Sequence, residues 1–120
     1  MNINEICKKV KAASIKLAAT ESEKKDKALL AIAESLDGHK EEIFKANRAD
    51  MERSEREGLA APLLKRLKFD EKKLYEVIDG IRSLAGLPDP VGRTLLSTEL
   101  DEGLELYKVT CPIGVIGVIF

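Results

Sequence analysis

The sequence predicts an incomplete α/β protein: a helical region comes first, then a two-stranded β-ribbon, and finally the first strand of a parallel sheet. Three observations support this class. In several segments before Gly86, apolar residues recur every three or four positions, which is typical of amphipathic helices. The prolines within residues 87–92 then stop the helical run. The last eight residues, 113–120, are all apolar or glycine, as in strands buried on both faces of a parallel sheet.

The first two helices are predicted by apolar stripes. The stripe of the first helix consists of Ile3, Ile6, Val10, Ala13 and Leu17. The second helix is expected to begin at Thr20, which forms a capping box with Glu23, and to end at Gly38 in the left-handed conformation. Its predicted buried stripe consists of Ala28, Leu29, Ile32, Ala33 and Leu36.

Three further helices are expected before the prolines. One starts near residues 37–40 and runs to Gly58, and its charged second half, residues 48–57, is predicted to be a solvated face. A short helix begins around Pro62, and Asp70 caps the last one, which ends near Gly86. The inward residues predicted for this last helix are Leu74, Val77, Ile78, Ile81 and Leu84.

Residues 93–100 and 104–111 predict a hairpin, because both favour strands and a short polar link joins them. Neither face of this ribbon is cleanly polar, so we expect it to need a partner surface. Residues 113–120 should then form an interior strand, whose parallel neighbours would have to come from further sequence. We therefore expect the N-terminal piece of a longer protein, or a strand completed by another chain.

The composition argues against several classes of function. With 20 basic and 21 acidic side chains the net charge is -1, without the clustered basic excess that nucleic-acid binding needs. The longest apolar run is far shorter than the roughly 20 residues of a membrane span, and the N-terminus does not resemble a signal peptide. We expect a cytoplasmic protein that binds neither nucleic acid nor membranes.

No catalytic constellation is visible in the sequence. Cys7 and Cys111 lack CxxC spacing, and together with the single His39 they form neither a disulfide framework nor a zinc site. Cys7 is expected to be partly buried. Cys111 precedes a turn at Pro112 and is the better candidate for reactivity, but it has no activating group and is also expected to be structural. His39 is expected to be exposed and to cap a helix rather than to act in catalysis.

Two other patterns are expected to be structural. Gly114 and Gly117 have GxxG spacing but no third glycine and no following helix, so neither a Rossmann fingerprint nor a P-loop is present. We expect these glycines to allow a neighbouring strand or helix to pack closely. The acidic pairs at 41–42 and 101–102 are adjacent in sequence, which does not make an acid/base pair.

Seven segments resemble, in their order and spacing, the N-terminal part of the gamma-glutamyl phosphate reductases. This family, also called glutamate-5-semialdehyde dehydrogenases, belongs to the aldehyde dehydrogenase superfamily. The segments are residues 27–36, 42–50, 58–59, 64–67, 87–92, 103–104 and 112–119. The most specific are Leu87-Pro-Asp-Pro-Val-Gly92 and Pro112-Ile-Gly-Val-Ile-Gly-Val-Ile119, and the resemblance extends over essentially the whole chain.

The resemblance implies a longer parent enzyme of proline biosynthesis, which reduces L-glutamyl 5-phosphate to L-glutamate 5-semialdehyde with NADPH and releases phosphate. In that family a cysteine thiolate displaces phosphate to form a thioester, and hydride transfer then leads to the aldehyde. The family's cysteine lies far downstream of these motifs. The resemblance therefore assigns no catalytic, cofactor-binding or metal-binding residue to this chain, which is expected to be inactive alone.

The resemblance also implies a place for each region. Residues 1–91 would be the helical N-terminal part of the cofactor-binding domain, residues 92–112 a β-ribbon arm that supports a homo-oligomer, and residues 113–120 the truncated first strand of the cofactor-domain sheet. Two alternatives stay open. One is a non-enzymatic helical interaction module that adds a strand to a partner's sheet. The other is a bifunctional synthase in which the reductase follows a kinase domain.

Overall fold

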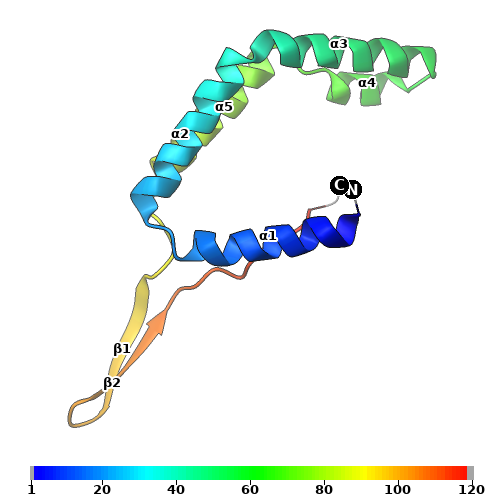
Figure 1. The fold of residues 1–120 in the computed structure, drawn as a ribbon. Coiled ribbons are helices and arrows are strands. Elements are labelled where there is room, and N and C mark those ends of the chain that lie inside the picture. Colours follow the sequence, from blue (N-terminus) through cyan, green and yellow to red (C-terminus); the bar gives the residue numbers. More distant parts are fainter. Residues whose placement is uncertain (1, 119–120) are drawn as a thin grey trace. The chain divides into compact units, whose positions relative to one another are not determined.

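The computed structural model describes residues 2–118, which form five helices and one two-stranded antiparallel sheet (Figure 1). The helices are α1 Ile3–Ala18, α2 Ser22–Gly38, α3 Lys40–Arg56, α4 Ala61–Leu67 and α5 Glu71–Ala85, and the strands are β1 Thr94–Asp101 and β2 Leu104–Val109. No helix within residues 2–118 combines the length and the apolar character needed to cross a membrane. The chain divides into two units: Glu23–Leu87, and a second unit formed by the segments on either side of it.

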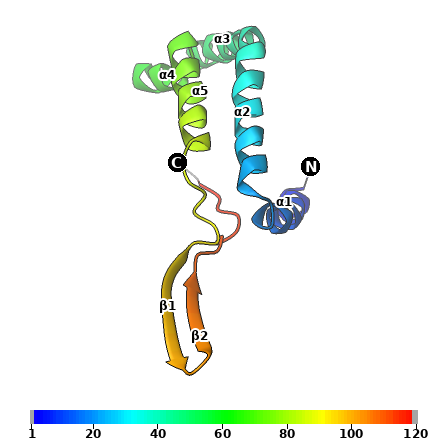
Figure 2. The ribbon, with the colours of Figure 1, turned by 90° about the vertical axis from the view of Figure 1, so that its left-hand side faces the viewer.

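The Glu23–Leu87 unit is built around α2 and α5, which lie side by side and run in opposite directions (Figures 1 and 2). Its fully buried residues are Ala33 of α2 and Leu74 and Ile78 of α5, each 1% exposed. The residues packed against these three are Leu36, Phe44, Phe69 and Ile81. The core therefore ties α2 and α5 to the first half of α3 and to the segment that precedes α5.

Two of the predicted helix ends are confirmed. Asp70 caps α5, because its Oδ1 accepts a hydrogen bond from the backbone N–H of Lys73 at 3.2 Å. Gly58 follows the end of α3 with a φ of 76°, a left-handed conformation that glycine adopts without steric cost. The charged second half of α3 lies mostly exposed, and Arg53 forms an ion pair with Asp50 at 2.5 Å, one turn away.

Two other predicted helix ends are wrong. Thr20 does not cap α2, since its hydroxyl donates instead to the carbonyl oxygen of Lys16 in α1 at 2.9 Å, and α2 begins at Ser22. A threonine hydroxyl can bond back to the preceding turn as readily as it caps the next helix. Gly38 is not left-handed; it is the last residue of α2, and the chain passes through the single residue His39 into α3.

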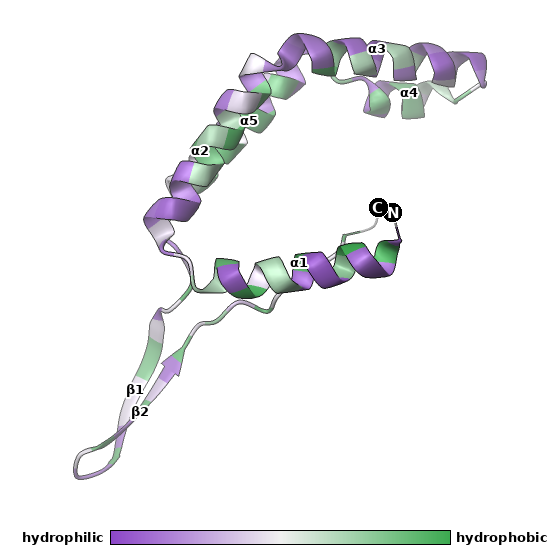
Figure 3. Cartoon of the chain, viewed as in Figure 1, coloured by the Kyte–Doolittle hydropathy of each residue, from purple (hydrophilic) through white to green (hydrophobic). Residues whose placement is uncertain are grey.

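The second unit contains α1 and the ribbon. Asn2 caps α1, because its Oδ1 accepts from the N–H of Asn4 at 3.1 Å, but no residue of α1 is fully buried. In the ribbon, β1 and β2 pair with Ser97 opposite Tyr107, and the chain turns at Gly103 with a φ of 73°. Every residue of both strands is exposed. The predicted hairpin is thus confirmed, and Figure 3 shows apolar residues along both of its strands.

The interior strand predicted at residues 113–120 is not found in the described part of the chain. Residues 110–118 have no regular secondary structure, and residues 119 and 120 lie outside the described range. A strand requires a hydrogen-bonded neighbour, and among residues 2–118 the strands β1 and β2 pair only with each other. Ile113 and Val118 are 92% and 75% exposed. The described residues therefore form helices and an antiparallel ribbon, without the parallel sheet of the expected α/β class.

Candidate functional site

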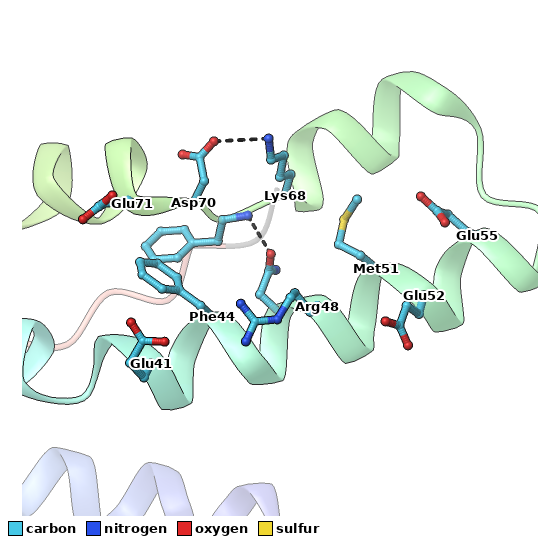
Figure 4. Close-up of a pocket in the computed structure, with 11 residues that line it drawn as sticks. Glu41, Phe44, Arg48, Met51, Glu52, Glu55, Lys68, Asp70 and Glu71 are labelled. Carbon is cyan, nitrogen blue, oxygen red and sulfur yellow. Dashed lines mark hydrogen bonds and ion pairs between the residues drawn. The ribbon is translucent and has the colours of Figure 1, made fainter.

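A groove of about 550 Å³ lies between α3 and the segment that connects α4 to α5 (Figure 4). Phe44, Met51 and Phe69 contribute its half-buried apolar lining. Five of its other lining residues are acidic and two are basic, so the rim carries a net negative charge. The groove lies entirely within the Glu23–Leu87 unit.

Asn47 holds the two sides of this groove together. Its Nδ2 donates to the carbonyl oxygen of Leu67 at 2.9 Å, and its Oδ1 accepts from the backbone N–H of Phe69 at 2.8 Å. Leu67 is the last residue of α4 and Phe69 lies in the link to α5, so both backbone groups are where helical hydrogen bonding is interrupted. The amide side chain therefore replaces backbone partners and fixes the link onto α3.

The sequence reasoning missed this role of Asn47. The one local signal is that asparagine is a weak helix former, yet Asn47 sits in the middle of α3. Its two partners lie 20 and 22 residues away. Only the packing of α3 against that distant link reveals the contact.

Asp70 stands at the edge of the groove and serves two partners. Its Oδ1 caps α5, while its Oδ2 lies 3.4 Å from the Nζ of Lys68 (Figure 4). The hydrogen bond from the N–H of Lys73, with a smaller contribution from Lys68, holds the pKa of Asp70 below its usual value. A carboxylate that stays ionised in this way is poorly suited to proton transfer near neutral pH. We therefore interpret Asp70 as a structural cap.

The groove presents no thiol, hydroxyl or imidazole group. None of its lining residues is a cysteine, histidine, serine, threonine or tyrosine. Within the described residues, no cluster of three or more His, Cys, Asp or Glu side chains could hold a metal ion. No buried side-chain nitrogen or oxygen in that range lacks a hydrogen-bond partner. The chemistry of the groove is that of a packing contact with an acidic rim.

The sequence-predicted candidates are dispersed over the chain. Cys7 and Cys111 are both free and exposed, so the expectation that Cys7 is partly buried is wrong. The reason is that α1 has no fully buried residue against which a side chain could pack. His39 is exposed and precedes α3 as expected, but its ring does not cap that helix. Its Nδ1 instead lies 2.7 Å from the carbonyl oxygen of Ser35 in α2.

The glycine pair does not pack closely against a neighbour in the described structure. A Cβ atom at Gly114 or at Gly117 would meet no heavy atom within 4 Å, contrary to the expectation. The acidic pairs take part in local structure. Glu41 and Glu42 lie in the first turn of α3, and Asp101 accepts a hydrogen bond from the N–H of Glu102 at 2.8 Å in the ribbon turn.

A second groove, of about 430 Å³, runs along α1. Val10, Ala13 and Leu17 of the predicted apolar stripe line it together with Val115. The segment predicted to be an interior strand therefore contributes to a groove on a helix. This groove contains no histidine, cysteine or acidic side chain and offers no catalytic chemistry.

The closely related sequences found are reductases. No protein-family model matches the chain. The chain is 67% identical over 120 residues to a gamma-glutamyl phosphate reductase of Pelotomaculum thermopropionicum, and 65% identical over 120 residues to that of Acetivibrio thermocellus. Each match includes 100% of this chain but 28% of the relative. The chain therefore spans little more than a quarter of the length of these curated relatives.

Solved structures give the same result for the fold. The gamma-glutamyl phosphate reductase of Thermotoga maritima matches with a TM-score of 0.90 and 35% identity, covering 94% of this chain and 27% of that one. The Saccharomyces cerevisiae enzyme matches with a TM-score of 0.85 and 37% identity, covering 90% and 28%. By sequence and by fold, this chain is similar over nearly its whole length to part of the gamma-glutamyl phosphate reductases, as its ordered motifs indicated.

Proposed function

We propose that these 120 residues form part of an oxidoreductase that converts L-glutamyl 5-phosphate to L-glutamate 5-semialdehyde in proline biosynthesis. The observation that carries this proposal is the 67% identity over the whole chain to a gamma-glutamyl phosphate reductase. Because the chain spans 28% of that relative, the activity is assigned to a longer protein. The same proposal places that enzyme in the cytoplasm.

NADPH is the proposed reductant, but the described residues do not fit a site for it. A dinucleotide site needs a glycine-rich turn that opens a helix, so that backbone N–H groups meet the pyrophosphate. Residues 110–118 are irregular, and no described helix follows them. The groove beside α3 has an acidic rim, which repels phosphates. Cofactor binding and the nucleophilic cysteine are therefore assigned to the remainder of the protein.

The contribution proposed for this chain is structural, within an aldehyde dehydrogenase-like fold. Residues 1–91 would be the helical part of the cofactor-binding domain, and residues 113–120 would become the first strand of its sheet when neighbouring strands are present. The ribbon of residues 92–112 would be the arm through which a homo-oligomer forms. This role of the ribbon is supported by the exposure of its apolar side chains, since Leu95 and Leu100 are 62% and 60% exposed.

The test is a turnover assay on the full-length protein that carries these residues. In the reverse direction, glutamate 5-semialdehyde, phosphate and NADP⁺ should give NADPH, followed by its absorbance. The 120-residue chain alone should give none. Cys7→Ser and Cys111→Ser should leave the turnover of the full-length protein unchanged, because neither thiol is assigned to the reaction. Absence of phosphate-dependent NADPH formation would refute the proposed activity, and loss of turnover in either variant would refute the placement of the nucleophile elsewhere.

A further inference from the structure

The groove beside α3 is elongated along that helix. Most of the α3 residues in its lining recur at steps of three and four positions, which places them on one stripe of the helix. These residues are Glu41, Phe44, Arg48, Met51 and Glu55. At 1.5 Å per residue, the stripe from Glu41 to Glu55 is about 21 Å long. The groove therefore offers the length of a helix of about four turns.

The floor of the groove is apolar and already formed. Phe44 and Met51 of α3 are half-buried, as is Phe69 on the opposite side. Phe44 and Phe69 also pack against the buried core of the Glu23–Leu87 unit. The two hydrogen bonds of Asn47 hold the opposite side onto α3. A partner that binds here would not have to order the groove, which lowers the cost of association.

The rim above this floor carries carboxylates without a cation. Among the residues drawn in Figure 4, the one ion pair joins Lys68 to Asp70 at 3.4 Å. The other four carboxylates of the lining are exposed and have no basic residue of the lining within ion-pair distance. They are Glu41, Glu52, Glu55 and Glu71. The groove therefore combines an apolar floor with unpaired negative charge along its edges.

We propose that this groove binds a cationic amphipathic helix of a partner protein. The floor would take apolar side chains spaced three and four positions apart, and the rim would meet lysine or arginine side chains beside them. A helix fits because it presents a straight apolar stripe with the same spacing as the α3 side of the groove. Five of the seven charged lining residues are acidic, so complementarity requires a basic partner. This interaction is additional to the proposed reductase reaction and does not depend on it.

Binding is measured on the full-length protein with a synthetic helical probe. The probe is the fluorescein-labelled peptide Leu-Lys-Lys-Leu-Leu-Lys-Leu-Leu-Lys-Lys-Leu-Leu-Lys-Leu, whose helix has a leucine face and a lysine face and spans about 21 Å. The charge control is the same peptide with glutamate in place of every lysine. Fluorescence anisotropy gives the dissociation constants at about 0.15 M salt, where exposed charges more than about 8 Å apart are largely screened. The lysine peptide should bind at least about tenfold more tightly than the glutamate peptide.

Paired substitutions separate the groove from the general charge of the protein. Glu41→Gln combined with Glu55→Gln removes two carboxylates of the rim and should weaken binding of the lysine peptide about fivefold. The matched control is Glu42→Gln combined with Glu57→Gln, which removes two exposed carboxylates beside these positions but outside the lining. It should change binding by less than about twofold. Met51→Ala reduces the apolar floor and should also weaken binding about fivefold.

Hydroxyl-radical footprinting reads the same site in the unsubstituted full-length protein, where saturating lysine peptide should slow the oxidation of Met51 severalfold. Failure of the lysine peptide to bind, or binding that leaves the oxidation of Met51 unchanged, would overturn the proposal. Equal weakening by the two glutamate pairs would also overturn it, since overall charge would then explain the attraction. Self-association of the protein that the lysine peptide displaces would make a second copy the occupant, and would overturn it as well.

Discussion

Replacing Asn47 by alanine should loosen the link between α4 and α5. The change removes the bonds to the Leu67 carbonyl and the Phe69 N–H, at 2.9 and 2.8 Å. A hydrogen bond contributes about 1 kcal/mol net, so the two together are worth about 2 kcal/mol. Alanine recovers up to about 0.7 kcal/mol through its higher helix propensity. We expect a loss of roughly 1.5 kcal/mol in the free energy of unfolding of the Glu23–Leu87 unit.

The Asn47→Asp variant tests the hydrogen bond to the Leu67 carbonyl separately from the bond to the Phe69 N–H. Asn47→Asp keeps an acceptor for the Phe69 N–H but loses the donor, and it places a carboxylate against the Leu67 carbonyl oxygen. It should be destabilised at pH 7. It should recover in part below about pH 4, where a protonated carboxyl can donate to that carbonyl. Asn47→Ala has no titrating group at this position and should show no such recovery relative to the unsubstituted chain.

Urea unfolding followed by circular dichroism at 222 nm measures the free-energy change. Hydrogen exchange at the Phe69 amide gives the local readout, since this N–H loses its partner only in the alanine variant. Lys45→Ala is the control on an exposed position of the same helix, and it should shift the free energy by no more than about 0.5 kcal/mol. An Asn47→Ala chain with an unchanged urea midpoint and unchanged Phe69 exchange would refute this reasoning.

Three further predictions concern other elements. Ile78→Ala should cost about 2 kcal/mol or more, because this side chain is 1% exposed, and a urea-midpoint change no larger than that of the neighbouring Val77→Ala would contradict it. The pKa of Asp70 is lowered in the folded chain. Its ionised form therefore stabilises α5 fully at any pH above the pKa that this carboxyl has in the unfolded chain. The stabilisation is lost as the pH falls through the lower pKa of the folded chain. The urea midpoint should therefore fall more steeply between pH 5 and pH 2 in the unsubstituted chain than in Asp70→Asn, whereas parallel pH profiles would show that this carboxyl does not titrate as inferred. Gly103→Ala should destabilise the ribbon by roughly 1 kcal/mol because the turn needs a left-handed residue, and unchanged amide exchange across β1 and β2 would exclude that cost.

The helices and the ribbon could be predicted because their signals are local. The Asp70 cap, the end of α3 near Gly58 and the turn at Gly103 each depend on residues only a few positions apart. Thr20 shows the limit of such signals. Its side chain could have capped α2, but its hydroxyl donates a hydrogen bond to the Lys16 carbonyl oxygen of the preceding helix. The exposure of Cys7 and of the stripe residues Ile32, Val77 and Leu84 could not be read from periodicity, which indicates the side of a helix that is apolar but not whether anything covers it.

The sequence by itself determined where the chain is helical, where it turns, and, through its ordered motifs, which family it resembles. Only the tertiary structure decided that Asn47 fastens α3 to the link after α4, and that residues 113–118 remain irregular among the described residues. The physical reason is the range of the interactions. The hydrogen bonds of caps and turns form within a few residues. A strand, or a side chain such as Asn47 that bonds to another element, needs hydrogen-bonding partners that are distant in sequence and are supplied only by packing.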